Sequence, residues 1–397
     1  MNLSALKSPG YRLYLIGNVF GMNANWIVRL VIGWLAWDLT KSPSFVGFVS
    51  FLSFSPVLLA GPFFGVITDR VELRTAMLFV QFTVAGLAAL LLGVLAMDAM
   101  SPHFLAIYAL VLGTALSAYQ PIRLSLGPRL VRPERISSVV GLGALNFNIS
   151  RLTGPAIAGI MIAKYGVIAT MLTASLLYIP FLIILSRLRP RPKIEQTESL
   201  PFWQSFRQGF AFIGTNRLIL IALVITGLFS FVIRGALEVL PIIADGVFHK
   251  GAAGLGMLTA AAGVGAVIAS IIQVTARPPE KGHIPKRALF ATLLGAMLML
   301  VLSFNDDWTA SVVIIAGVGF TSTLVGVNFQ SAVQMQLDDN IRGRVMALWM
   351  TVAVGGTSLG ALGIGVLIDI LGFQIAMGSV GSISLVVFAM LLTRIWR

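Results

Sequence analysis

The chain has 397 residues, of which 57% are hydrophobic and 11% are charged, and its mean hydropathy is +0.92. Because a soluble protein carries roughly 25% charged residues, this composition excludes an ordinary soluble domain and indicates an integral membrane protein. The net charge of +13 would suit a nucleic-acid partner, but the basic residues gather in the short segments between apolar runs, which indicates membrane topology instead.

Twelve apolar segments follow one another along the chain. Each has about the 20 residues that a helix needs to cross a bilayer, and none alternates as the strands of a membrane barrel do. An even number of spans puts both termini on one side, and most of the 28 lysines and arginines fall on that side, which is therefore predicted to be cytoplasmic. The predicted spans are 11–37, 44–68, 75–97, 102–122, 137–163, 167–187, 218–243, 252–275, 286–304, 308–332, 343–368 and 373–393.

The longest polar stretch lies between the sixth and seventh spans. It predicts an N-terminal six-helix bundle over residues 1–188, a cytoplasmic linker over 189–216 and a C-terminal six-helix bundle over 217–397. Apolar residues recur at helical spacing within the linker, which predicts a short amphipathic helix on the cytoplasmic face of the membrane. An ordered linker tucked under the bundle is the alternative. The residues concerned are Trp203, Phe206, Phe210 and Ile213.

The two predicted bundles resemble each other at an offset of 206 residues. Gly159 and Gly166 correspond in this way to Gly365 and Gly372, and a parallel duplication is typical of transporters whose halves rock about a central site. Small residues four apart, which let helices pack closely, predict that spans two, five, eight and eleven form the contact between the halves and that spans one, four, seven and ten line a central path. Ordinary helix packing is the alternative. These pairs are Gly61/Gly65, Gly154/Ala158, Ala261/Gly265 and Gly356/Gly360.

The turn between the second and third spans, "GVITDRVELR", concentrates charge in a chain that has little of it. Its residues Gly65, Asp69, Arg70 and Arg74 resemble the Gly-x-x-x-Asp-Arg-x-x-x-Arg loop of the major facilitator superfamily. A carboxylate is stabilised at a helix N-terminus, and arginine binds carboxylates in a bidentate manner. The resemblance implies that Asp69, Arg70 and Arg74 gate transport by latching the cytoplasmic ends of the two halves. The alternative is that these charged residues only anchor the turn on the cytoplasmic side of the membrane.

The fifth span extends this resemblance. Its segment "GPAIAG", which begins at Gly154, is similar to the Gly-Pro-x-x-Gly-Gly element of exporters. The stretches 120–159 and 337–348 are similar to the secretion-effector branch of the superfamily, typified by the enterobactin exporter and the macrolide efflux proteins. The resemblance implies export by an all-α fold of twelve transmembrane helices in two pseudo-symmetric bundles. Pro155 removes a helical hydrogen bond and kinks the span, so Arg151, Gly154 and Pro155 are predicted to be structural or gating residues.

Two positions depart from that branch. Its members often have Asp in the first helix where this chain has Asn25, and an amide cannot carry a proton. The loop after the eighth span has basic residues but no aspartate, so the cytoplasmic latch is expected on one side only.

Polar side chains within the spans are the candidates for substrate binding and coupling, because a charge at membrane depth costs about 2.5–3.5 kcal/mol on insertion scales. Arg234 is predicted to reach Glu238 one helical turn away, and the polar residues of the first span share one face. For each of them, a satisfied hydrogen bond between helices is the alternative. The predicted substrate and coupling residues are Asn18, Met22, Asn25, Arg29, Gln120, Arg234, Glu238 and Asn328.

Glu238 is the only glutamate within a span, so it is the predicted carboxylate for proton coupling, and movement of Arg234 relative to it would switch its protonation. No Gly-x-x-x-x-Gly-Lys-Ser/Thr motif is present to bind a nucleotide, which leaves an ion gradient as the energy source. The three histidines lie in loops without ligand spacing, so no metal, cofactor or enzyme activity is predicted. A membrane scaffold or sensor is the alternative.

The sequence therefore predicts a secondary active transporter of the bacterial inner membrane that exports a small amphiphilic, siderophore- or drug-like molecule in exchange for protons. Uptake of a solute or flipping of a lipid-like molecule is the alternative. The expected partners are the substrate, protons and membrane lipid, without nucleic acid, and the expected state is a monomer. Arg29 and Arg234 favour substrates with anionic or strongly polar groups.

Overall fold

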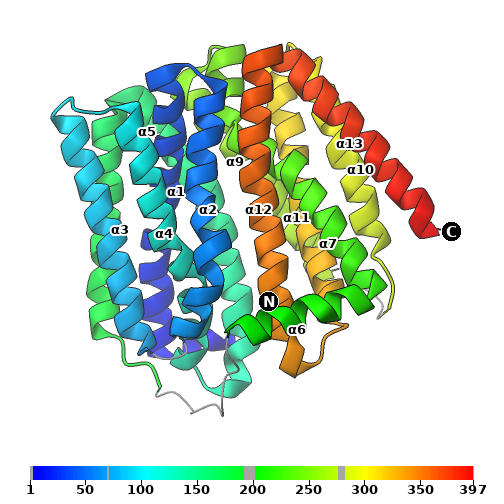
Figure 1. Cartoon of the computed structure of the whole chain (residues 1–397). Helices are drawn as coiled ribbons and strands as arrows, with labels where there is room; N and C mark the ends of the chain where they lie inside the picture. Colours follow the sequence, from blue (N-terminus) through cyan, green and yellow to red (C-terminus); the bar gives the residue numbers. More distant parts are fainter. Residues whose placement is uncertain (1–2, 69–70, 192–201, 276–281, 397) are drawn as a thin grey trace.

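The fold is built almost entirely from membrane-spanning helices. The computed structural model describes residues 3–68, 71–191, 202–275 and 282–396, without the side chains of 59–68, 202–206, 274–275, 339–340 and 394–396. In these ranges every regular element is helical, and ten helices are long and apolar enough to cross a membrane. α5 (Ile136–Arg187) holds two predicted spans and α2 (Pro43–Thr68) is a further apolar helix, so the twelve predicted spans are accounted for (Figure 1).

The helices of the first half begin at residues suited to helix starts. α1 begins on Pro9, whose missing N–H is tolerated in a first turn. α4 also begins on a proline, and the hydroxyl of Ser101 before it accepts a hydrogen bond from the Phe104 N–H, which caps the helix. Besides α2 and α5, the helices of this half are α1 (Pro9–Thr40), α3 (Leu73–Ala96) and α4 (Pro102–Leu126).

A glycine kink divides α5 into its two spans. Gly166 has φ +79° and ψ 174°, backbone angles that residues with a side chain rarely adopt. Gly372 has φ +77° and ψ 162° and separates α12 (Asp339–Leu371) from α13 (Phe373–Trp396). The same backbone break thus occurs at the two glycines that the sequence repeat pairs, which supports the repeat.

The seventh predicted span is not a continuous α-helix. α7 (Arg217–Phe229) leads into a π-helical turn, η4 (Ser230–Arg234), which is followed by α8 (Gly235–Glu238) and a second π-helical segment, η5 (Ile242–Val247). π-helical turns accommodate an extra residue and are frequent at functional sites. The other helices before α12 are α9 (Gly251–Thr275), α10 (Lys286–Ser303) and α11 (Trp308–Gln334).

The two halves meet where α2 packs along α12 and α5 packs along α9; Figure 1 shows the blue α2 beside the orange α12. These helices are spans two, eleven, five and eight, so the predicted contact between the halves is confirmed. Gly159 and Gly256 lie back to back, and a Cβ on Gly159 would stand 2.6 Å from the Gly256 Cα. Gly365 similarly faces the backbone of Pro43. Glycine is required at these points because the two backbones touch.

The small-residue pairs that suggested this contact lie elsewhere. Gly154 packs on α1, Gly265 on α11 and Gly360 on η4, so these glycines join helices within each half. Their assignment to the contact between the halves was wrong, because close packing inside a bundle requires small residues as much as a moving interface does. Gly61 and Gly65 lie outside the residues whose side-chain surroundings are described.

The linker contains the predicted helix, α6 (Phe202–Thr215), which crosses the lower end of α12 in Figure 1. The Arg344 guanidinium of α12 donates a hydrogen bond to α6, and Ile213 is buried. α6 is therefore tucked against the second half, as the alternative interpretation of its pattern proposed. Trp203 and Phe206 lie outside the described side chains.

The helix ends define two sides of the molecule. α6 lies on one side, and the turns at 41–42 and 248–250 lie on the opposite one, which we call the distal side (Figure 1). Gly256 stands near the start of α9, so its contact with Gly159 is near the distal side.

Gly159→Val is expected to hold the halves apart on the distal side, because the valine side chain would overlap the backbone at Gly256. Gly143→Val in the same helix is the matched control, since a Cβ at Gly143 meets nothing within 4 Å. The chain has no cysteine, so a single Phe54→Cys reporter can be labelled with a membrane-impermeant maleimide added on the distal side. Labelling should rise several-fold in Gly159→Val only, and equal labelling of the two variants would contradict the role of this contact.

Candidate substrate and coupling site

An ion pair at membrane depth joins the two halves. Nη2 of Arg29, on α1, lies 2.6 Å from Oε1 of Glu238, on α8. The guanidinium also lies over the rings of Trp26 and Phe54, 5.1 and 4.5 Å from their centroids, which adds cation–π attraction. The Arg29 side chain is 42% exposed and that of Glu238 is 18% exposed, so the pair lies between the halves with part of its surface accessible.

Arg234 does not make the predicted ion pair with Glu238. Among the described residues this carboxylate pairs with Arg29 instead. Nη2 of Arg234 donates to the Ser322 carbonyl oxygen at 3.4 Å and packs on Gly326 of α11, while its Nε is buried without a partner. Arg234 is the last residue of the π-helical turn η4, and its guanidinium is directed at α11 and not at Glu238.

Arg151 of α5 is the fourth charged residue of this region. It lies close enough to Arg234, Arg29 and Glu238 for their charges to interact, and no ion pair reaches it in the part of the chain that the structure describes. Its carbonyl oxygen faces Gly263 of α9, so Arg151 stands at the contact between the halves. We call Arg29, Arg151, Arg234 and Glu238 the central charge cluster, which holds three positive charges and one negative charge.

Asn18 and Asn25 bind neighbouring helices of the first half. Asn18 donates a hydrogen bond to Tyr119 Oη at 2.8 Å and accepts one from Asn146 at 2.9 Å. Asn25 accepts a hydrogen bond from the Tyr178 hydroxyl at 2.7 Å. These are the satisfied contacts between helices that the alternative interpretation described, and they do not favour substrate contact by either amide.

Met22 and Gln120 belong to the same internal network. The Met22 sulfur lies 3.5 Å from Nδ2 of Asn146 and 3.9 Å from Nη1 of Arg123. Gln120 accepts a hydrogen bond from Arg123 Nε at 2.8 Å. The sequence pattern did not indicate this structural position of Arg123, because a basic residue at the end of a span is expected to determine membrane topology. The available signal was its position one helical turn after Gln120.

Asn328 of α11 is buried and donates to the Leu324 carbonyl oxygen of its own helix at 2.8 Å, and among the described residues it makes no hydrogen bond with the central charge cluster. An open cavity of about 370 Å³ lies at the end of α11. The cavity is lined by Ser331, Gln334, Met335 and Arg342.

Of the three predicted latch residues, the structure describes only Arg74; Asp69 and Arg70 lie outside the described residues. Arg74 donates to the carbonyl oxygens of Leu185, at 3.1 Å, and Ser186. Both carbonyls belong to the C-terminal end of α5, where the helix dipole favours a cation. In this structure Arg74 therefore binds within its own half.

Gly154 and Pro155 differ in position although they are adjacent. Gly154 packs on Trp26 within the first half, whereas the Pro155 carbonyl oxygen faces Gly256 across the contact between the halves. Pro155 therefore lies at the contact between the halves and Gly154 lies within the first half. The non-helical backbone angles of α5 occur at Gly166, between its two spans, and a kink at Pro155 stays a prediction.

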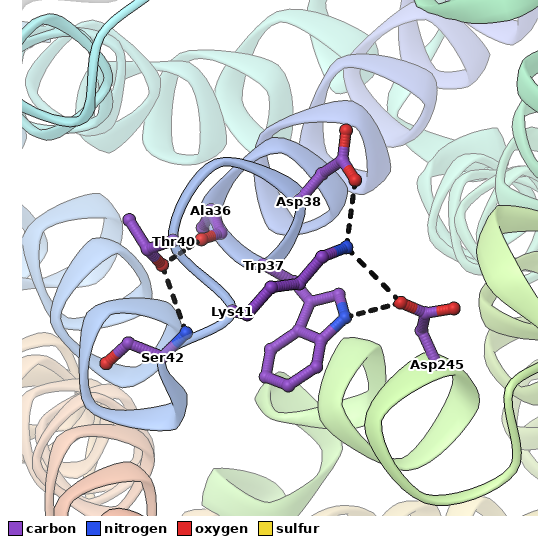
Figure 2. Close-up of polar contacts among 7 residues, drawn as sticks. All are labelled: Ala36, Trp37, Asp38, Thr40, Lys41, Ser42 and Asp245. Atoms are coloured by element: carbon purple, nitrogen blue, oxygen red, sulfur yellow. Dashed lines mark hydrogen bonds and ion pairs between the residues drawn. The ribbon is translucent and has the colours of Figure 1, made fainter.

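Two carboxylates tie the halves together on the distal side. Figure 2 shows Asp245 of η5 accepting a hydrogen bond from Trp37 Nε1 at 2.8 Å, with Lys41 Nζ 3.4 Å from the same oxygen. Asp369 of α12 accepts hydrogen bonds from Ser42 Oγ at 3.0 Å and from the backbone N–H of the first turn of α2 at 2.9 Å, where the helix dipole favours an anion. We call these two contacts the distal latch. No short-range sequence pattern indicated these two contacts, since each joins residues more than 200 positions apart.

Lys41 and Asp245 are both charged near neutral pH. Burial raises the pKa of Asp245, but the hydrogen bond from Trp37 and the charge of Lys41 lower it more, so that this pKa lies below the usual 3.8. Burial lowers the pKa of Lys41, but the hydrogen bond and charge of Asp38, together with Asp245, raise it above the usual 10.5. The contact is therefore present at neutral pH and is lost only as the pH falls through the depressed pKa of Asp245.

Residues 1–396 match a protein family described as transmembrane secretion effector. The chain belongs to this family. It is 26% identical over 402 residues to the enterobactin exporter of Citrobacter koseri, with 99% of this chain and 93% of that protein covered. An enterobactin exporter of Escherichia coli is 27% identical over 368 residues, with 91% of this chain and 86% of that protein covered.

The fold of this secretion effector recurs in solved transporter structures. It matches a nucleoside transporter with a TM-score of 0.73 at 13% identity, covering 100% of both chains. It matches the human organic anion transporter with a TM-score of 0.68 at 15% identity, covering 96% of this chain and 98% of the other. At such identities the likeness shows the fold alone. Together with the family, it confirms a multi-pass membrane transporter of the major facilitator superfamily, which is not an enzyme.

Asp245→Asn is expected to weaken the distal latch, because the amide cannot hold the charge of Lys41. Labelling of the Phe54→Cys reporter from the distal side should rise several-fold at neutral pH, where Asp245 and Lys41 of the unsubstituted secretion effector are both charged. Asp98→Asn, at an exposed carboxylate in the turn after α3, is the matched control. Unchanged labelling in Asp245→Asn would mean that this contact does not hold the distal side closed.

Proposed function

We propose that this secretion effector exports a small amphiphilic molecule across the bacterial inner membrane by alternating access, in exchange for protons. The observation that carries the proposal is the ion pair between Arg29 and Glu238, which joins the halves at membrane depth and is partly exposed. Such a pair has to break when the halves separate there. A carboxylate that loses its cation in an apolar site favours the protonated form, so proton uptake by Glu238 is linked to the movement.

The direction of transport is proposed from the relatives, whose names describe them as enterobactin exporters. The distribution of lysine and arginine favours both termini and α6 in the cytoplasm, which makes the distal side the periplasmic one. The substrate would then bind while the distal latch is closed and Glu238 is ionised. Opening of the latch would separate Arg29 from Glu238, so that a periplasmic proton binds the carboxylate as the substrate leaves.

The moving parts are proposed to be the two bundles, residues 1–188 and 217–397, joined by the linker over 189–216. The working unit is proposed to be a monomer, because the proposed coupling pair of Arg29 and Glu238 forms within one chain. Membrane lipid surrounds the bundles, and the outward-facing apolar side chains suit that environment.

An amphiphilic substrate is favoured by the surroundings of the ion pair. The rings of Trp26 and Phe54 flank the Arg29 guanidinium, so apolar surface and charge are available within a few ångströms of each other. Ligand sites of this kind bind an apolar body by contact area and orient it with a small number of polar groups.

Glu238→Gln is expected to abolish gradient-driven export while leaving exchange of substrate across the membrane, because the amide keeps the shape of the side chain but cannot bind and release a proton. Everted vesicles from a bacterial strain without its own exporters allow both measurements: accumulation of a fluorescent amphiphile under an imposed pH gradient, and counterflow without one. Glu134→Gln, at an exposed carboxylate outside the spans, is the matched control. Full accumulation by Glu238→Gln would exclude this residue as the coupling site.

Expression of the chain in the same strain is expected to increase resistance to, or secretion of, at least one compound in a panel of amphiphilic drugs and siderophores. The effect should disappear in Glu238→Gln produced at an equal level, because export against a gradient needs coupling. Hypersensitivity to the same compounds would contradict export and support uptake.

A further inference from the structure

We infer that Arg123, Phe147 and Trp26 form a binding site for an aromatic ring that carries a negative charge, beside the coupling pair of Arg29 and Glu238. The inference rests on the proposed transport function and adds the chemical class of the substrate and the residues that recognise it. Arg123 lies in the last turn of α4, Phe147 in α5 and Trp26 in α1, so the site is built where three helices of the first half meet.

Cations and aromatic rings alternate along this site. Cζ of Arg123 lies 5.8 Å from the centroid of the Phe147 ring, which in turn lies 5.9 Å from the Trp26 ring at an interplanar angle of 67°. Cζ of Arg29 lies 5.1 Å from the other end of this series, the Trp26 ring. We call Arg123, Phe147, Trp26 and Arg29 the cation–aromatic ladder. It leads from the end of α4 to Glu238, which Arg29 binds at 2.6 Å.

The ladder lies on the side of the first half that faces the second half. Phe147 stands between two asparagines of α5. Asn146 binds Asn18 of α1 at 2.9 Å, and Asn148 Nδ2 lies 3.4 Å from Oγ of Ser270, on α9 in the second half. Phe147 is therefore directed at the space between the halves, into which Arg29 also extends.

The ladder can be reached from the side of the molecule on which α6 lies. Arg123, Phe147 and Trp26 are each half-buried, so part of every side chain remains accessible. Val140 and Ala144 share the face of α5 that carries Phe147, because they precede it by seven and three residues, and both are exposed. With the distal latch closed, this is the side from which the proposed function has the substrate enter.

Arg123 is the cation of the ladder that remains available to a substrate. Arg29 already holds a carboxylate, whereas no ion pair among the described residues reaches Arg123. Its Nε donates to Gln120 at 2.8 Å and its Nη1 lies 3.9 Å from the Met22 sulfur, so most of its five N–H donors are left over. Its distance of 5.8 Å from the Phe147 ring is close to the limit of about 6 Å for cation–π attraction. A carboxylate bound by the planar fork would be a stronger partner.

The neighbouring rings favour an aromatic body over an aliphatic one. Phe147 and Trp26 meet edge to face, an arrangement that leaves ring surface for a further aromatic partner. A substrate ring would gain stacking with these side chains and cation–π attraction from the arginines, in addition to the apolar area that it buries. A saturated body of the same size would gain the area alone.

The test measures binding of 2-naphthoate, its neutral amide 2-naphthamide and its saturated analogue decahydro-2-naphthoate, by calorimetry on the full chain in lipid nanodiscs. 2-Naphthoate should bind about tenfold or more tightly than the amide, the factor that a charge-assisted hydrogen bond supplies. It should bind about threefold or more tightly than the saturated acid, the factor that an aromatic contact adds. No binding of 2-naphthoate, or binding equal to that of either comparison compound, would overturn the site.

Each side chain should control a different preference. Arg123→Gln should remove the preference for the acid over the amide, whereas Arg187→Gln, at an exposed arginine in the last turn of α5, should leave it unchanged. Phe147→Leu should remove the preference for the aromatic acid over the saturated one and keep the preference for acid over amide. Phe79→Leu, at an exposed ring on α3, is its matched control. Preferences that persist in Arg123→Gln and Phe147→Leu would place the binding of naphthoate elsewhere and contradict the inference.

Arg123→Lys distinguishes a contact with the substrate from a structural role of the arginine. The lysine keeps the charge but not the planar fork, so the preference for the acid over the amide should decrease but remain. Its complete loss together with a lower melting temperature would mean that Arg123 only holds Gln120 and Met22 in place, and would overturn its contact with the substrate.

Glu238→Gln separates this inference from the coupling proposal on which it rests. The variant should retain both binding preferences, since neither depends on a proton gradient, while it loses gradient-driven export. Failure of the coupling proposal therefore leaves the binding result interpretable, and failure of naphthoate binding leaves the coupling result intact.

Discussion

A charge inside a bilayer requires an opposite charge or water, and this requirement organises the centre of the transporter. Glu238 finds its counter-charge on Arg29, in the other half of the chain, so the contact that satisfies the carboxylate is also one that separation of the halves has to break. Partial exposure of both side chains lowers the cost of breaking it, because water replaces part of the lost interaction. The pair is therefore suited to reversible exchange of partners and contributes less to permanent stability than a fully buried pair would.

The distal side is closed by contacts of two different kinds. Gly159 and Gly256 bring two backbones together, which gives close packing without a directional bond. Asp245 and Asp369 accept hydrogen bonds at the helix ends, where water competes for the same groups and each contact is worth little by itself. A closed state that depends on several weak contacts is stable enough to be populated, and it also opens without a single large barrier. Alternating access requires both properties.

The arrangement of the helices was predictable because span length, the placement of basic residues and the paired glycines Gly166 and Gly372 are properties of the sequence alone. The partner of Glu238 was not, because residue spacing within one helix predicts only neighbours on that helix, whereas Arg29 lies 209 positions away in the other half. Small-residue spacing predicted that Gly154 packs closely but not against which helix. The contact between Trp37 and Asp245 depends on how two distant segments meet, which no local pattern contains.

Buried polar atoms without a partner among the described residues occur in both halves, at Tyr14 and Gln81 as well as in the seventh span. In the first half, Asn18 and Asn25 bind neighbouring helices, which fixes α1 and the Arg29 that it carries. In the second half, buried atoms of Thr226, Ser230 and Arg234 have no partner among the described residues, and all three lie on α7 and η4. Unsatisfied buried groups cost free energy that a different pairing regains, and a π-helical turn lets a segment shift its register by one residue. The segment that carries Arg234 and leads into Glu238 therefore gains free energy from a change of partners, while the hydrogen bonds of Asn18 and Asn25 hold α1 and Arg29 in place as that change is made.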